Sequence, residues 1–338
     1  MKGPPHKALI IKPSSLGDIV HSLPFLDAIH RTYPDAELHW VVAKGFEGIL
    51  EGHPFLKKIW IIHKDEWKKI GMFRKTLSEL QGLFMGLREE GFDLVVDLQG
   101  LFRSGVIARS TNAPVRLGFT EAREGSKVFY TQTIEGGRNI HAVDRYLKIA
   151  SFLGCKVEEV NFPLPPSGGS SSDKIPFSER VCGEYGVIVP GARKPSKRWP
   201  AERFGKVASI LPFSTVVIGS RADMVLAEEV VRASEGKAFS IAGKTGLKGL
   251  VEVIRCTRFV VCNDTGPMHI AAALGVPVVA LFGSSDPLKT GPYTSKCTII
   301  RKDLPCVPCE KKSCKSPVCM DMIQVHEVAD AINAFLAR

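Results

Sequence analysis

The sequence predicts an α/β protein made of two halves, each a parallel sheet flanked by helices. Short apolar runs typical of buried strands alternate with longer amphipathic segments almost throughout the 338 residues, and this alternation favours βαβ units. It is interrupted once, by the Pro-, Gly- and Ser-rich stretch 163–172, which is typical of a linker. The chain is long enough for two domains, each with its own core.

The expected elements follow in order along the chain. In the first half, strands are expected at 8–11, 38–42, 58–62 and 93–97, and helices at 19–33, 73–90 and 141–153. In the second half, strands are expected at 185–189, 214–218, 259–262 and 276–282, and helices at 200–211, 224–233, 248–255 and 267–274. The resulting domains are 1–162 and 177–322, with a linker at 163–176 and a C-terminal helix within 323–338. Ligands are expected in a cleft between the halves, at the carboxyl ends of the strands.

Composition narrows the class of partner. The chain is 44% hydrophobic and 24% charged, with a formal net charge of +10, which indicates a soluble globular protein with an anionic partner. A nucleic acid is disfavoured because the basic residues are spread over loops, with no recognition helix and no aromatic-rich strand. The longest apolar stretch, 270–282, is too short to span a bilayer, and the N-terminus does not resemble a signal peptide. We therefore expect a cytoplasmic protein.

The segment 261–275 (VCNDTGPMHIAAALG) is the most informative. An apolar strand leads into a polar turn, Pro267 falls at the first position of the following helix, and Gly275 falls at its C-terminal cap. Such a turn directs backbone N–H groups and the positive end of a helix dipole at one point, which suits a phosphate or diphosphate. Asp264, Thr265 and His269 lie at the same point. The alternative is an ordinary capped turn.

A second polar loop follows the first strand. Only Gly17 is present where a dinucleotide-binding fold would have Gly-x-Gly-x-x-Gly, and the second strand ends without an acidic residue for a ribose, which disfavours a nicotinamide-dependent dehydrogenase. Asp18 lies at the start of a helix. It either stabilises the helix dipole or faces the cleft as a general base.

Further loops follow other strands. Residues 97–104 (DLQGLFRS) would lie on the same rim as Asp18, or form an ordinary turn. Residues 190–200 (PGARKPSKRWP) place four basic residues at the carboxyl end of a strand, where a lysine would neutralise a departing diphosphate. The alternative is a solvated run of charge. Asp223, after the next strand, is a candidate for a ribose hydroxyl.

Taken together, these residues resemble the ADP-heptose:lipopolysaccharide heptosyltransferases, glycosyltransferase family 9, over nearly the whole chain. The matching segments are 12–24 (KPSSLGDIVHSLP), 97–104, 120–124, 141–145, 197–200 (KRWP), and Asp264-Thr265-Gly266 with His269. The resemblance implies a GT-B fold of two Rossmann-like domains facing a central cleft, with the last helix packing back on the first domain. It also implies inverting, metal-independent transfer of heptose from ADP-heptose to a Kdo-type or heptose sugar of the lipopolysaccharide inner core.

The resemblance also implies roles for individual residues. Asp18 would be the general base, and Lys197 would bind the diphosphate; the two would meet when the cleft closes. Donor contacts are expected from Ser14, Ser15, Gly17, Arg193, Asp223, Asp264, Thr265, Gly266 and His269, and acceptor contacts from His21, Gln99 and Arg123. Ala192 and Arg193 replace hydroxyl residues of the family pattern. Residues 120–124 look more like the enzyme that adds the first heptose, whereas the C-terminal cysteines look more like the enzyme that adds the second.

Four of the nine cysteines, at positions 306, 309, 314 and 319, are clustered. Their spacing would allow a tetrahedral thiolate site for structural zinc or iron. The alternatives are free thiols or a redox-labile loop, and the resemblance implies that catalysis needs no metal.

The basic surplus suits phosphorylated lipid A in the anionic inner membrane, where the chain would bind peripherally. Two other functions stay open: the same fold acting on another nucleotide sugar or acceptor, and a nucleotide-sugar-binding protein without catalysis.

Overall fold

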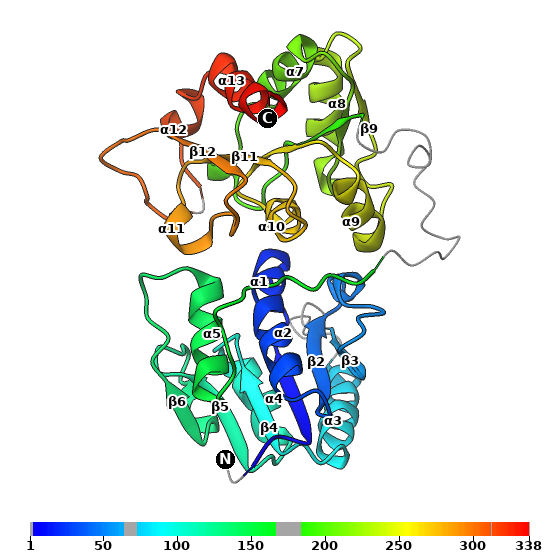
Figure 1. The fold of residues 1–338 in the computed structure, drawn as a ribbon, viewed down its shortest axis with the longest axis vertical. Coiled ribbons are helices and arrows are strands. Elements are labelled where there is room, and N and C mark those ends of the chain that lie inside the picture. The colour runs from blue at the N-terminus through cyan, green and yellow to red at the C-terminus, as the bar shows by residue number, and fades with distance from the viewer. Residues whose placement is uncertain (1–2, 64–72, 167–183, 312, 338) are drawn as a thin grey trace. The chain divides into compact units, whose positions relative to one another are not determined.

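The computed structural model describes residues 3–63, 73–166, 184–311 and 313–337. The chain divides into two compact units, Met1–Pro166 and Ser167–Arg338, and each contains one sheet (Figure 1). The division falls inside the segment 163–176 that the sequence marks as a linker, of which residues 167–176 lie outside the described part.

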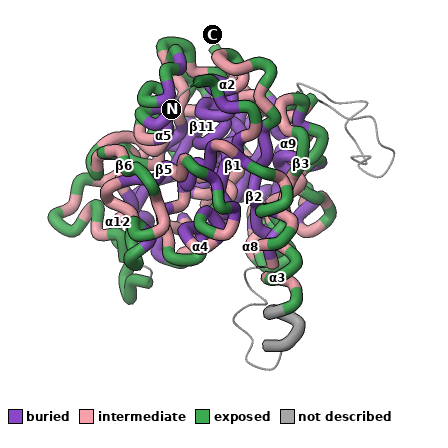
Figure 2. The backbone as a smooth tube through the Cα atoms, turned by 90° about the horizontal axis from the view of Figure 1, so that it is seen from below, coloured by how far each residue is buried: buried purple, intermediate pink, exposed green. Residues whose placement is uncertain are grey.

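The first unit is a parallel six-stranded sheet in the order β3-β2-β1-β4-β5-β6. Its strands are β1 (Lys7–Ile11), β2 (Glu37–Ala43), β3 (Lys58–Ile62), β4 (Leu94–Asp97), β5 (Val115–Phe119) and β6 (Gln132–Ile134). Its helices are α1 (Leu16–His21), α2 (Leu23–Thr32), η1 (Glu47–Ile49), α3 (Phe73–Glu89), α4 (Phe102–Ser110), η4 (Ser126–Phe129) and α5 (Ala142–Phe152). The central strands are buried (Figure 2), as expected for a parallel sheet covered on both faces.

The second unit repeats this topology, with a parallel sheet in the order β12-β11-β10-β7-β8-β9. Its strands are β7 (Gly186–Val189), β8 (Thr215–Val217), β9 (Ala238–Ser240), β10 (Val260–Asn263), β11 (Val278–Phe282) and β12 (Cys297–Arg301). Its helices are η6 (Pro195–Lys197), α7 (Ala201–Ile210), η7 (Arg221–Asp223), α8 (Met224–Ala233), α9 (Leu247–Arg255), α10 (Gly266–Ala273), α11 (Pro287–Thr290), α12 (Val318–Asp321) and α13 (Val325–Leu336).

Both sheets have the Rossmann order, in which the chain proceeds outward in opposite directions from two adjacent central strands. These switch points lie between β1 and β4 in the first unit, and between β7 and β10 in the second. Ligands of open α/β sheets bind outside the carboxyl ends of the strands at such points. The topology therefore directs attention to the loops after these four strands.

One expected helix differs from the structure. The helix expected at 19–33 is two helices, because Pro24 lies in the first turn of α2, where its missing N–H costs nothing, and the chain breaks at Ser22. The C-terminal helix is α13. It packs against α7, β11 and β12 of the second unit, and its buried Val328 and Ile332 belong to the core of that unit. The packing of this helix on the first domain stays a prediction.

Candidate active site

Asp18 lies in the first turn of α1, at the switch point of the first unit. Its Oδ2 accepts hydrogen bonds from the backbone N (2.9 Å) and Oγ (2.6 Å) of Ser15, which is the N-cap of α1. This capping box keeps the carboxylate in the first turn of α1, the position that the dipole-stabilising role weighed from the sequence requires. The Asp18 side chain keeps 36% of its surface exposed, so its carboxylate also remains accessible. The role of general base stays a prediction.

Lys12 is a buried cation that the sequence reasoning left without a role. It directly follows β1 and is 3% exposed. Its Nζ donates to the carbonyl oxygen of Leu98 (3.1 Å), lies 3.9 Å from Asp18 Oδ1, and lies 4.9 Å from the ring centre of Tyr146. Burial by itself lowers the pKa of Lys12. Tyr146 and the carboxylates of Asp18 and Asp97 raise it by more, so the pKa lies above its ordinary value. Lys12 thus links the loop after β1 to the loop after β4.

The end of β4 fixes the turn that carries Gln99. Asp97 is fully buried and accepts hydrogen bonds from Tyr130 Oη (2.6 Å), Gln99 N (2.8 Å) and Gly100 N (3.0 Å). Burial raises the pKa of Asp97, and these hydrogen bonds oppose the shift. Gly100 adopts a positive φ of 66°, which suits a glycine, and its carbonyl oxygen accepts from Arg123 N (2.8 Å). The loops that bear Gln99 and Arg123 are therefore joined.

The expected acceptor residues differ in exposure. Arg123 is exposed and Gln99 is half-buried. His21 is only 2% exposed, and its ring meets that of His141 edge to face at 4.9 Å. The structure thus places His21 inside the fold and Arg123 on the surface.

In the second unit, Lys197 and Asp264 form an ion pair between the loops after β7 and β10. Their side chains are 16% and 7% exposed. Ser285 Oγ donates a hydrogen bond to the same Asp264 oxygen. Asn263 holds the two loops together, because its amide donates to Pro190 O (2.8 Å) and accepts from Trp199 N (3.0 Å). A buried amide thereby sets the position of the lysine loop.

The helix α10 starts beside this ion pair. Thr265 is its N-cap, Gly266 and Pro267 open the first turn, and His269 lies one turn in, 6% exposed. The positive end of the α10 dipole and Lys197 therefore lie at the same switch point. Binding of a phosphate or diphosphate at this point stays a prediction.

Asp223 and Arg193 lie on the neighbouring loops. Asp223 Oδ2 accepts hydrogen bonds from Ser220 N (2.9 Å) and Ser220 Oγ (2.6 Å), a second capping box. Its carboxyl group packs so closely over Gly191 that a Cβ at Gly191 would collide with Asp223 Oδ1. Arg193 is exposed. The structure therefore brings Asp223 to the loop that carries Lys197, and its donor-binding role stays a prediction.

The segment that carries the clustered cysteines is hydrogen-bonded to the loop that carries Lys197. The backbone N atoms of Cys309 (3.0 Å) and Glu310 (2.7 Å) donate to Ser284 O, and Ser196 Oγ donates to Lys311 O (2.8 Å). Cys306 and Cys314 are exposed, while Cys309 and Cys319 are partly buried. Within the described residues, no three His, Cys, Asp or Glu side chains are grouped so as to hold a metal ion. Metal binding by these cysteines stays one alternative beside free thiols and a redox-labile loop.

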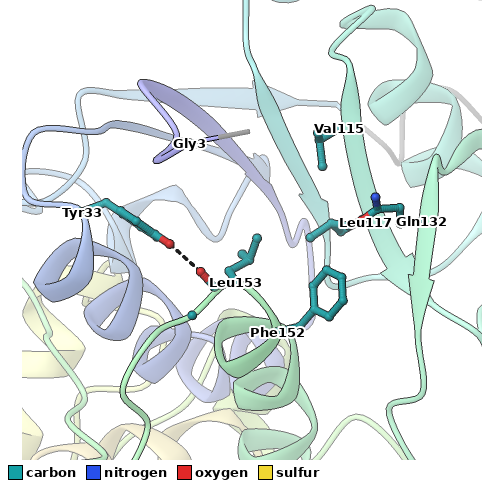
Figure 3. A pocket seen from close by; sticks show the side chains of 8 residues that line it. Gly3, Tyr33, Val115, Leu117, Gln132, Phe152 and Leu153 are labelled. Atoms are coloured by element: carbon teal, nitrogen blue, oxygen red, sulfur yellow. Dashed lines mark hydrogen bonds between the residues drawn. The ribbon is translucent and has the colours of Figure 1, made fainter. Parts of the chain in front are cut away.

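A pocket lies at the opposite, amino-terminal edge of the first sheet (Figure 3). Val115, Leu117 and Phe152 give it an apolar lining, and Tyr33 Oη donates to Leu153 O at its side. It contains none of the residues singled out from the sequence. We do not assign it to the active site.

Comparison with known proteins decides the family. The model of "Glycosyltransferase family 9 (heptosyltransferase)" matches residues 81–319, more than half of the chain. The chain belongs to glycosyltransferase family 9. Lipopolysaccharide heptosyltransferase 1 of Pseudomonas aeruginosa is 29% identical over 360 residues, covering 98% of this chain and 98% of that protein.

Solved structures agree in fold. The glycosyl transferase family 9 protein from Veillonella parvula matches with a TM-score of 0.83 and 23% identity, covering 98% of this chain and 97% of that one. The E. coli heptosyltransferase WaaC with ADP matches with a TM-score of 0.78 and 22% identity, covering 97% and 99%. This family 9 chain is therefore a glycosyltransferase with the GT-B architecture of two Rossmann-like domains, which confirms the fold class and family predicted from the sequence.

Proposed function

We propose that this chain transfers heptose from ADP-heptose to a Kdo-type or heptose sugar of the lipopolysaccharide inner core, with inversion. The observation that carries the proposal is the chemistry at the two switch points. One has an accessible carboxylate, Asp18, and the other has a lysine, Lys197, beside the start of α10. A carboxylate base and a cationic diphosphate site are the two parts that a single displacement needs.

In the proposed reaction, an acceptor hydroxyl attacks the anomeric carbon of the donor. The new C–O bond forms as the bond from that carbon to the β-phosphate oxygen breaks, and the hydroxyl proton passes to Asp18. Lys197 and the positive end of the α10 dipole stabilise the negative charge that develops on the departing ADP. Positioning contributes as well, because both units have to act on the same pair of substrates.

The ion pair with Asp264 has a role in this proposal. Without donor, Asp264 compensates the charge of the largely buried Lys197. When the diphosphate binds, Lys197 turns to it, and Ser285 keeps a hydrogen bond on Asp264. Asp264 would thus keep a partner throughout the reaction cycle.

ADP release is the test of this function. We expect release from ADP-heptose only when an acceptor is present, either heptose-free Kdo–lipid A or an acceptor that already carries one heptose. The acceptor that supports release assigns the enzyme to the first or the second heptose. Lys197→Ala should weaken ADP binding and lower turnover, by about 10²-fold or more. ADP binding without transfer to either acceptor would favour the non-catalytic alternative, and release from a different nucleotide sugar would favour the other enzyme.

We place this reaction at the cytoplasmic face of the inner membrane. The support is the net charge of +10 and the phosphorylated, lipid-borne acceptor that the function requires. No helix in the described ranges is both long and apolar enough to span a bilayer. Cell fractionation followed by a salt wash tests the location: a peripheral protein leaves the membrane fraction at high salt.

A further inference from the structure

Two segments of the first unit form one exposed surface. The start of α4 packs on η4: the rings of Phe102 and Phe129 meet edge to face with centroids 5.3 Å apart, and Phe102 N donates to Glu124 Oε2 (3.2 Å). We use the name α4–η4 surface for the exposed residues at the start of α4, in the turn before η4 and in η4 itself; they are Phe102, Arg103, Arg123, Glu124, Gly125, Lys127 and Val128.

This surface exposes large apolar side chains. Phe102 is 50% exposed and Val128 is 79% exposed. Single exposed apolar residues are common and need no explanation. Here, however, an aromatic and an aliphatic side chain come from two segments that pack together, and both stand among cations.

The charge of the surface is positive. Arg103, Arg123 and Lys127 are exposed, and the acidic residue among them is Glu124, which accepts the hydrogen bond from the first turn of α4. Cations around apolar side chains suit the interface of an anionic bilayer, where the apolar groups enter the headgroup region and the cations meet lipid phosphates.

The surface also adjoins the candidate acceptor site. Arg123 N donates to Gly100 O (2.8 Å), and Gly100 follows Gln99 in the turn held by the buried Asp97. Lys12 connects that turn to Asp18 through Leu98. The surface is thus continuous with the carboxyl edge of the first sheet, where an acceptor sugar would be used.

We propose that the α4–η4 surface docks this chain on an anionic lipid bilayer. Phe102 and Val128 enter the headgroup region, while Arg103, Arg123 and Lys127 contact lipid phosphates. The docked chain then presents the edge that bears Asp18 and Gln99 to a sugar carried by a lipid in the same bilayer. The last step rests on the proposed heptose transfer; docking rests only on the membrane location proposed with it.

Vesicle sedimentation tests the docking. The full chain is mixed with phosphatidylcholine vesicles, with or without phosphatidylglycerol. We expect it to sediment with the anionic vesicles, and less at high salt. Removing two surface charges with Arg103→Ser and Lys127→Ser should weaken binding about 20-fold or more, at roughly fivefold per charge. Phe102→Ser with Val128→Ser should weaken it about tenfold, because their apolar area leaves the interface.

Matched controls lie elsewhere on the same unit. Phe152 is 57% exposed and lines the pocket at the opposite edge of the sheet (Figure 3), and Arg88 is an exposed cation on α3. Phe152→Ser and Arg88→Ser should leave vesicle binding within twofold of the wild type. Three results would overturn the proposal. They are an equal loss of vesicle binding in the control and surface variants, vesicle binding that does not depend on phosphatidylglycerol, and no vesicle binding by the wild type. Binding of a protein partner to the α4–η4 surface by a chain that does not bind vesicles would also refute docking on lipid.

A soluble acceptor separates the two proposals. With a deacylated acceptor, Lys127→Ser and Val128→Ser should transfer heptose at the wild-type rate, because no bilayer is involved. Vesicle binding by a chain that transfers no heptose would refute the proposed function and leave docking standing. Transfer to the soluble acceptor by a chain that binds no vesicles would refute docking and leave the proposed heptose transfer standing.

Discussion

Replacing Lys12 with methionine removes a buried charge at the centre of the first switch point. The change takes away the hydrogen bond to Leu98 O, the 3.9 Å approach to Asp18, and a positive charge near the buried Asp97. A buried carbonyl oxygen that loses its donor costs about 1–3 kcal/mol, and removing one member of a buried charge set costs about 3–5 kcal/mol. Because methionine fills a similar volume and offsets part of this, we expect a loss of about 2–4 kcal/mol of folding free energy.

Thermal unfolding measures this loss. For a unit of this size, the expected change lowers the unfolding midpoint of the first unit by about 5–10 °C. Lys58→Met is the matched control. Lys58 also pairs with a carboxylate, Glu90 (2.9 Å), and lies over an aromatic ring, Trp60 (3.7 Å), but its side chain is 48% exposed. Such a surface pair contributes about 0–1 kcal/mol. Equal unfolding midpoints for Lys12→Met and the wild type would refute the interpretation that Lys12 stabilises the fold by linking the loop after β1 to the loop after β4.

The pH dependence follows from the sign of the shift. The pKa of Lys12 in the folded chain lies above the ordinary value of 10.5, so the folded chain retains this proton to higher pH than the unfolded chain does. The stabilisation is complete below the unfolded pKa and is lost as the pH rises through the folded pKa. The difference in midpoint between the wild type and Lys12→Met should therefore be constant near neutrality and narrow above about pH 10.5. A difference that narrows below pH 9 would contradict this account.

Other predictions concern the second unit. Ser285→Ala removes a hydrogen bond from Asp264 and should weaken ADP binding by a few-fold, less than Lys197→Ala does; calorimetric titration with ADP ranks the two, and the reverse order would count against the donor site described here. Gly191→Ala places a Cβ against the carboxyl group of Asp223 and should cost about 1–3 kcal/mol in unfolding experiments; an unchanged midpoint would show that the loop relaxes freely. Elemental analysis of the purified chain separates the alternatives at the four clustered cysteines: one zinc or iron per chain would show a structural metal site, and none would leave free thiols or a redox-labile loop.

Much of the fold could be predicted from the sequence because the central strands are apolar runs. Four edge or near-edge strands escaped prediction. β5 contains Arg116 and Gly118, β6 and β9 have only three residues each, and β12 is only partly buried. Such strands are defined by pairing with a neighbour, which local composition does not encode.

The final helix shows another limit. Its amphipathic pattern predicts a buried face, and α13 has one. The pattern does not say which surface covers that face. The structure resolves this through Trp199, whose indole N donates to Ile323 O (3.1 Å) just before the helix, while Val328 and Ile332 complete the same core. The packing of this helix on the first domain, which the family resemblance implies, stays a prediction.

The candidate site was predictable in part. Residues at the ends of central strands share one edge of a parallel sheet, so Asp18 with Gln99, and Lys197 with Asp264, could be grouped from the sequence. The role of Lys12 was missed, because a lysine after a strand usually turns to solvent. The one sequence signal for the burial of Lys12 is that it directly follows an apolar strand, which a parallel sheet buries on both faces. The burial of His21 was also missed, since α1 is short and its inward face depends on α5.

The turnover of Asp18→Asn tests the central claim most directly. Asparagine keeps an oxygen that can accept from Ser15, so the capping box survives while the base is lost. Glu327→Gln is the control, because Glu327 accepts from Gln324 N (2.8 Å) in the equivalent box of α13. We predict that Asp18→Asn binds ADP-heptose as the wild type does and lowers kcat about 10²-fold or more, while Glu327→Gln leaves kcat unchanged. An unchanged kcat in Asp18→Asn would reduce Asp18 to a helix cap and contradict the account.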